Sequence, residues 1–190
     1  SQSDWSSDVC SSDLAPLDQQ ADMLHELFPD AKNVGILYCS AEPNSAYQSQ
    51  TIQGYLKDYG YECTEYTFAD SNDIASVVNN AIATSDVLYI PTDNTAASNT
   101  TIIQNICQPA GIPIIAGEEG ICSGCGVATL SISYYDLGYK TGEMAYEILV
   151  NGADVSQTAV EFAPNVTKKY NAANCEALGI TVPDDYVAIE

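Results

Sequence analysis

Short apolar runs alternate with helix-length amphipathic segments along most of the chain, and this alternation limits the fold more than any other feature. Runs typical of buried or half-buried strands occupy residues 33–38, 61–68, 86–90, 112–116, 127–133 and 158–162. Helical spacing is found in residues 17–28, 45–60, 70–83, 94–107, 137–151 and 170–178. Alternating strands and helices predict an α/β fold, a doubly wound, mostly parallel sheet with helices on both faces.

The composition fits one acidic domain. The chain has 190 residues, of which 46% are hydrophobic, and it contains no apolar run long enough to cross a bilayer. Its 26 acidic residues face five lysines and no arginine, for a formal charge of −21. Such a surface repels phosphate backbones, so we expect no nucleic-acid partner.

Three loops follow predicted strands and carry the candidate binding residues. Ligands of open α/β sheets bind at the carboxyl ends of the strands, which here point to residues 39–45, 91–98 and 117–120. These loops hold carboxylates and amides, namely Glu42, Asn44, Asp93, Asn94, Glu118 and Glu119. Asn44 or Ser45, and Asp93 or Asn94, are also suited to cap the helices that follow. Three such strand ends together favour a cleft for a small polar ligand.

The charges in these loops indicate what that ligand carries. No lysine lies in them, so a ligand carboxylate would depend on helix N-terminal N–H groups and hydroxyls, whereas an ammonium would meet carboxylates. A zwitterionic amino acid fits both conditions. Tyr47 and Tyr134, near the same rim, are suited to stack on an apolar side chain, although ordinary packing is the alternative for each.

The cysteines raise an enzymatic alternative. Cys122 and Cys125 form a C-x-x-C motif, which in thiol–disulfide oxidoreductases opens a helix. Here a strand-like run follows, so we interpret the pair as a local disulfide or two plain thiols in a loop. No second ligand pair suits zinc, and the sequence has no nucleophile elbow, phosphate loop or dinucleotide fingerprint. We therefore expect no enzymatic activity, no metal and no cofactor.

Three strings carry a resemblance to a known family. "ELFPDAKNVGILYCSAEPNS", "DVLYIPTDNT" and "ISYYDLGYKTGEMAYEIL" resemble ABC-transporter substrate-binding proteins of the tryptophan/tyrosine-binding type, which have the type I periplasmic-binding-protein fold. The resemblance implies an extracytoplasmic protein, commonly lipid-anchored, that binds an amino acid and delivers it to ABC permease subunits. A ligand-sensing regulatory domain of the same fold is the alternative.

The resemblance also implies the site residues and the extent of the chain. It assigns ligand contacts to Ser40, Glu42, Asn44, Ser45, Asp93, Asn94, Glu118 and Glu119, and places Ser131 and Tyr134 at the last hinge crossing. It implies that residues 15–190 form the C-terminal lobe and that 135–151 pack on an N-terminal lobe which this sequence lacks.

The first 14 residues have a different character. The stretch "DWSSDVCSSDL" at residues 4–14 lacks the basic start and apolar core of a signal peptide, and it has no apolar residue at the place before Cys10 where lipid attachment would require one. It can be encoded by a common sequencing-library adapter read in frame. We expect residues 1–14 to be adapter-derived and non-native, with a disordered segment as the alternative.

Overall fold

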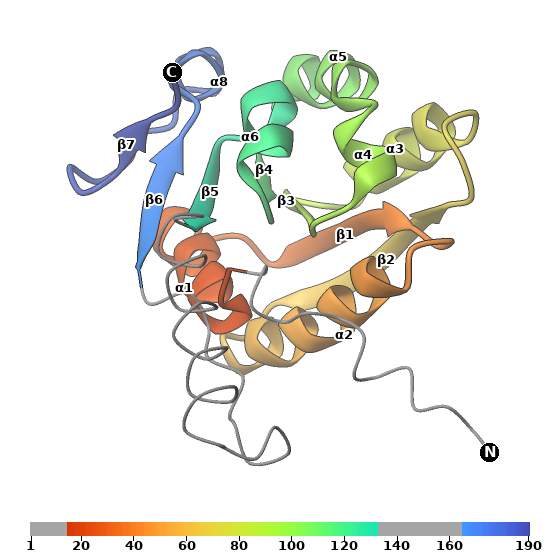
Figure 1. The fold of residues 1–190 in the computed structure, drawn as a ribbon, viewed down its shortest axis with the longest axis horizontal. Coiled ribbons are helices and arrows are strands. Elements are labelled where there is room, and N and C mark those ends of the chain that lie inside the picture. The colour runs from red at the N-terminus through yellow and green to blue at the C-terminus, as the bar shows by residue number, and fades with distance from the viewer. Residues whose placement is uncertain (1–14, 133–164) are drawn as a thin grey trace, which may run out of the picture.

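A sheet with helices on both faces dominates the structure. The computed structural model describes residues 15–132 and 165–190, in which seven strands form one sheet (Figure 1). The strands are β1 Asn33–Cys39, β2 Glu62–Phe68, β3 Val87–Ile90, β4 Ile114–Ala116, β5 Ala128–Ile132, β6 Val166–Tyr170 and β7 Val187–Ala188. Their order in the sheet is β2-β1-β3-β4-β5-β6-β7, and all neighbours are parallel except β5 and β6. The predicted doubly wound, mostly parallel α/β fold is confirmed.

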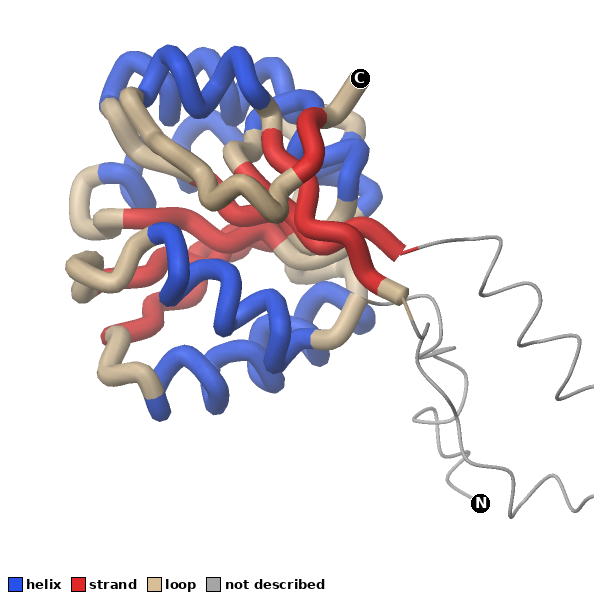
Figure 2. The backbone as a smooth tube through the Cα atoms, turned by 90° about the vertical axis from the view of Figure 1, so that its left-hand side faces the viewer, coloured by secondary structure: helices blue, strands red, loops and turns tan. Residues whose placement is uncertain are grey.

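The helices cover both faces of the sheet, as Figure 2 shows edge-on. Their bounds are α1 Leu17–Leu27, α2 Pro43–Asp58, α3 Ile74–Ile82, α4 Asn94–Ala97, α5 Thr100–Ala110, α6 Glu119–Cys125 and α8 Ala172–Leu178. Residues of α1 and α2 pack in one hydrophobic cluster, while residues of α3, α5 and α6 pack in a second cluster on the other face.

The central strands are buried on both faces because their sequences are almost entirely apolar. Along β1, Ile36 belongs to the cluster beneath α1 and α2, whereas Leu37 belongs to the cluster beneath α3 and α5. The same alternation places Tyr89 and Leu88 of β3 on opposite faces. Fully burying a large aliphatic side chain contributes about 1.5–3 kcal/mol, so these strands hold the fold together.

Two predicted helices differ from the observed ones, one in its starting residue and the other in its continuity. Helix α2 begins at Pro43 rather than near Ser45, because proline suits the first helical position and the Glu42 carbonyl accepts the Ala46 N–H at 3.2 Å. The predicted helix over 94–107 is interrupted at Asn99, whose side chain donates to the Thr95 carbonyl at 2.8 Å. The interruption separates α4 from α5.

Helix α6 occupies a segment that the sequence predicted to be a turn. Its Gly120 and Gly124 are poor helix formers, but Ile121, Cys122 and Cys125 are buried against the second cluster. Gly124 allows close contact with α5, since a Cβ there would lie 2.3 Å from the Thr100 hydroxyl. Tertiary packing therefore outweighs helix propensity in this segment.

Strand β6 was not predicted, although the helix that follows it was. Its sequence, VTKKY, contains two lysines and no residue that is fully buried. It pairs with β5 over five residues, and its side chains alternate between the two faces of the sheet.

Several expectations fall outside the described residues. They are the helix over 137–151, the strand over 158–162, the packing of 135–151, the position of Tyr134 and the nature of residues 1–14. Within the described ranges, no helix has the length and apolar character needed to cross a bilayer.

Candidate ligand-binding site

The carboxyl ends of the parallel strands meet at one edge of the sheet. Strand β1 lies between β2 and β3, so the chain reverses its direction of progress across the sheet between β1 and β3. Such a topological switch point is where open α/β sheets bind ligands. The loops over 40–42 and 91–93, which we call the switch loops, lie at this point.

Asp93 acts as a structural cap in the switch loops. It is 1% exposed, and its carboxylate accepts the Cys39 N–H at 2.7 Å and the Ala96 N–H at 2.8 Å. The first bond ties the end of β1 to the loop after β3, and the second caps α4. Capping, one of the two roles expected from the sequence, is therefore the role that the structure shows for Asp93.

Glu42 binds the same short helix from the other switch loop. Its carboxylate accepts the backbone N–H groups of Asn94 and Thr95, each at 2.9 Å, and bonds from both of their side chains. Burial alone would raise the pKa of Glu42, but these hydrogen bonds outweigh it and hold the pKa below its ordinary value. The N–H groups that a ligand carboxylate would need at α4 are thus occupied.

Other predicted residues of the first loop hold the backbone of Thr92. The Ser45 hydroxyl and the Asn44 amide donate to its carbonyl at 3.0 and 3.1 Å. Gln48, which the sequence did not single out, accepts the Thr92 N–H at 3.0 Å. Neither Asn44 nor Ser45 caps α2, whose N-cap residue is Glu42.

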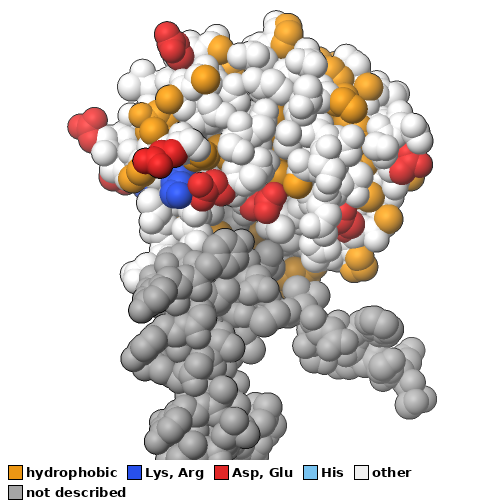
Figure 3. Space-filling view, turned by 45° about the horizontal axis from the view of Figure 1, so that its top comes forward, with side chains coloured by type: hydrophobic (Ala, Val, Ile, Leu, Met, Phe, Trp, Pro, Cys, Tyr) orange, Lys and Arg blue, Asp and Glu red, His pale blue; other side chains and the backbone are white. Residues whose placement is uncertain are grey.

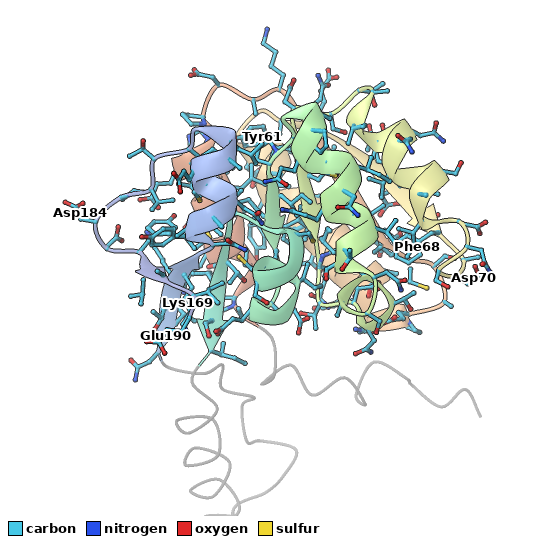
Figure 4. The ribbon with its side chains drawn as sticks, turned by 90° about the horizontal axis from the view of Figure 1, so that it is seen from above. Tyr61, Phe68, Asp70, Lys169, Asp184 and Glu190 are labelled. Carbon is cyan, nitrogen blue, oxygen red and sulfur yellow. The ribbon has the colours of Figure 1, made fainter. Side chains whose placement is uncertain are left out.

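Ser40 stabilises the edge of the sheet. Its hydroxyl donates to the Phe68 carbonyl at 3.3 Å, and its N–H donates to the same oxygen at 2.9 Å. The contact joins the ends of β1 and β2, and Phe68 is labelled at this position in Figure 4.

A cavity of about 450 Å³ opens beside the loop after β4, and we call it the ligand cavity. It brings together three of the predicted residues, Glu118, Glu119 and Ser131. The rest of its lining comprises Ala15, Thr92, Gly117, Gly120, Ser123, Leu130, Ile132, Ile189 and Glu190. Glu42 and Asn94 instead line a separate hollow beside Asp70. The structure therefore divides the predicted residues between two places.

Gly117 is essential to the shape of the ligand cavity. A Cβ at this position would lie 2.8 Å from the Thr92 nitrogen and 2.9 Å from the Pro91 carbonyl carbon. Only glycine lets the loop after β4 lie this close to the loop after β3. Tyr47, by contrast, is 57% exposed and does not line this cavity.

Glu118 presents a half-buried carboxyl to the ligand cavity. Burial raises its pKa above the ordinary value, the charge of Asp93 adds to that rise, and the Ile121 N–H opposes it. A carboxylate in this position is stabilised when a positive charge arrives. The arrangement suits a ligand ammonium.

Glu119 connects the ligand cavity to the strands β5 and β6. Its carboxylate accepts the Ser131 hydroxyl at 2.8 Å and forms an ion pair with Lys169 at 3.0 Å. Burial would raise the pKa of Glu119, but the hydrogen bonds from Lys169 and Ser131 outweigh it and lower the pKa. The sequence did not place Lys169 near the site because β6 itself was not predicted.

The C-x-x-C pair lacks the properties of a redox centre. Cys122 and Cys125 lie in α6 and are free and buried, not paired in a loop. Burial raises the pKa of Cys125 to about 12 and raises that of Cys122 as well, so neither thiol is an activated nucleophile. Among the described residues, no group of three or more potential ligands is arranged to hold a metal ion.

The sheet topology is that of the type I periplasmic-binding-protein fold, and similar solved structures with this fold are substrate-binding proteins. The chain belongs to the ABC transporter substrate-binding protein family, whose model matches residues 8–189. The predicted resemblance to this family is confirmed.

Three relatives are informative. A tyrosine-binding protein of Clostridioides difficile (strain R20291) is 36% identical over 138 residues, which is 73% of this chain and 40% of that protein. A ligand-free, open substrate-binding protein with adhesive properties from Clostridium difficile is 34% identical with a TM-score of 0.78, covering 94% of this chain and 61% of that one. A Streptococcus pneumoniae ABC domain in complex with L-Trp is 30% identical with a TM-score of 0.74, covering 89% and 58%. The chain thus spans less than two thirds of the length of these relatives.

Proposed function

We propose that this chain is the solute-binding component of an ABC importer and that its ligand is an amino acid. The observation that carries the proposal is the half-buried Glu118 carboxyl in the ligand cavity. A volume of about 450 Å³ lies within the range of roughly 300–1,000 Å³ usual for small-molecule sites. Pairing with an ammonium would compensate the carboxylate that burial disfavours.

The walls of the ligand cavity favour a ligand with an apolar side chain. Leu130, Ile132 and Ile189 supply an aliphatic surface beside the two carboxylates. The tyrosine-binding relative and the L-Trp complex support an aromatic amino acid.

The carboxylate of the ligand must bind away from α4, because Glu42 and Asp93 already accept its N-terminal N–H groups. Thr92 is a suitable neutral donor, since its hydroxyl lines the ligand cavity and its bond to the Gly117 carbonyl is long, at 3.5 Å. The site therefore recognises the two ends of a zwitterion by different groups.

Family membership supports the rest of the proposal. The protein acts outside the cytoplasm, delivers its ligand to ABC permease subunits, and has no catalytic role of its own. Of the predicted ligand contacts, we retain Glu118, Glu119 and Ser131, which line the ligand cavity. Tyr134 stays a prediction.

Calorimetric titration tests the proposal. The chain, and any longer natural protein that contains it, is titrated with the twenty common amino acids and with glucose and ribose as controls. We expect saturable binding of L-tryptophan or L-tyrosine and none of the sugars. Binding of a sugar without binding of any amino acid would contradict the proposal.

A further inference from the structure

Lys169 is the described lysine whose ion-pair partner lines the ligand cavity. Its Nζ atom lies 3.0 and 3.2 Å from the two carboxylate oxygens of Glu119. Lys168, the preceding residue on β6, pairs instead with Glu26 at 2.8 Å and Asp185 at 3.3 Å on the opposite face of the sheet. Of these two neighbours, Lys169 alone acts on a group of the ligand cavity.

The ligand cavity is otherwise strongly acidic. Glu118, Glu119 and Glu190 line it, and the buried carboxylate of Asp93 is close enough to raise the pKa of Glu118. Figure 4 labels Lys169 and Glu190 at the same edge of the molecule, and on the face drawn in Figure 3 acidic side chains are more frequent than basic ones. Without Lys169 the Glu119 carboxylate would be uncompensated, and the net charge around the cavity would be more negative by one.

A more negative cavity would treat the two ends of an amino acid differently. It would attract the ammonium more strongly and repel the carboxylate, so a simple amine would gain over a zwitterion. With Lys169 bound to Glu119, that repulsion is reduced while the Glu118 carboxyl still faces the cavity.

We propose that Lys169 sets the charge preference of this site, making it select a zwitterionic amino acid over a cationic amine. The inference rests on the proposed amino-acid function. Lys169 acts through Glu119 and is therefore a positioning residue, not a ligand contact.

A pair of probes that differ in one charged group tests this inference. L-tryptophan carries an ammonium and a carboxylate, while tryptamine has the same ring and ammonium but no carboxylate. Dissociation constants for both are measured by calorimetry on the wild type, Lys169→Met and Lys168→Met. The readout is the ratio of the two constants, which a general loss of stability does not change.

We expect Lys169→Met to shift the ratio toward tryptamine by about tenfold, the effect of one uncompensated charge several ångströms away at a partly screened site. Lys168→Met, which removes the adjacent ion pair on the other face, should change the ratio by less than about twofold. Glu119→Gln leaves the Lys169 charge unpaired, so it should shift the ratio the opposite way, toward L-tryptophan. This third variant keeps the test decisive if Lys169→Met does not fold.

The possible results distinguish a failure of the charge-selection role from a failure of the proposed amino-acid function. If the wild type binds both probes and the variants of Lys169 and Glu119 leave the ratio unchanged, the charge-selection role is overturned and the amino-acid function stands. Equal shifts in Lys169→Met and Lys168→Met would also overturn it. If the wild type binds neither probe nor any amino acid, the proposed function fails and this inference fails with it.

Discussion

Two acidic regions lie next to each other at the carboxyl edge of the sheet, and they use their carboxylates in opposite ways. In the switch loops, Glu42 and Asp93 accept backbone N–H groups from α4 and β1. In the loop after β4, Glu118 faces a cavity and burial raises its pKa, whereas the hydrogen bonds of Glu42 lower its own.

The difference shows how the same residue type becomes structural or functional. A carboxylate whose oxygens already accept several backbone hydrogen bonds is stabilised in its charged form, so a cationic ligand would stabilise it little further. A half-buried carboxylate with fewer hydrogen bonds is stabilised in its charged form when a cation binds beside it. Proximity to the topological switch point is therefore insufficient to identify a ligand contact.

Replacing Asp93 should give the largest effect on stability. Asp93→Ala leaves the N–H groups of Cys39 and Ala96 without their buried acceptor and removes the cap of α4. We expect a loss of about 2–4 kcal/mol in the free energy of unfolding, measured by urea denaturation. Asp184→Asn, on an exposed loop labelled in Figure 4, is the control and should change it by less than about 0.5 kcal/mol. Similar losses in both variants would show that Asp93 has no special role.

Replacing Glu42 should have a smaller effect that depends on pH. Glu42→Gln weakens the bonds to Asn94 and Thr95, and because the carboxylate is partly exposed we expect a loss of about 1 kcal/mol at pH 7. The folded-state pKa of Glu42 is lowered from 4.5, so its stabilisation is present above that value and is lost as the pH falls through the folded pKa. Urea denaturation at pH 7 and pH 3 measures the difference between wild type and variant. A difference that grows on acidification would contradict this account.

The last and smallest of these effects concerns the alkylation rates of the thiols in α6, which report whether the loop after β4 opens. We expect iodoacetamide at pH 8 to modify the half-exposed Cys63 at least about tenfold faster than the buried Cys122 and Cys125, as followed by peptide mass spectrometry. Burial raises the pKa of Cys125 to about 12, and it suppresses access as well as ionisation. Rapid selective modification of Cys122 would revive the redox hypothesis.

The sequence predicted the parallel sheet well because its central strands are continuous apolar runs bounded by turns. The same local reasoning missed α6 and β6. Helix α6 contains two glycines and forms because Ile121 and Cys122 are buried against other elements. Strand β6 is held by pairing with β5 and by ion pairs on both faces, which are contacts between distant parts of the chain.

The placement of the three loops was predictable, but the roles of their carboxylates were not. All three predicted loops lie at the carboxyl edge, because the parallel pairing of β1, β3 and β4 brings the ends of these strands to one edge of the sheet. Whether hydrogen-bond donors fully occupy a carboxylate depends on which distant parts of the chain the fold brings next to it. Nothing local to Glu42 indicates that the N–H groups of Asn94 and Thr95 reach it, and nothing local to Glu119 indicates Lys169.

One measurement tests the contrast between the two regions most directly. It is the dissociation constant of L-tryptophan, or of the amino acid that binds tightest, for Glu118→Gln and Glu42→Gln against the wild type. We predict that Glu118→Gln weakens binding by about 10- to 100-fold, as expected for losing a charged hydrogen bond, while Glu42→Gln changes it by less than about twofold. Equal affinities for wild type and Glu118→Gln, or a larger loss in Glu42→Gln, would contradict the assignment of the ligand to the cavity beside β4.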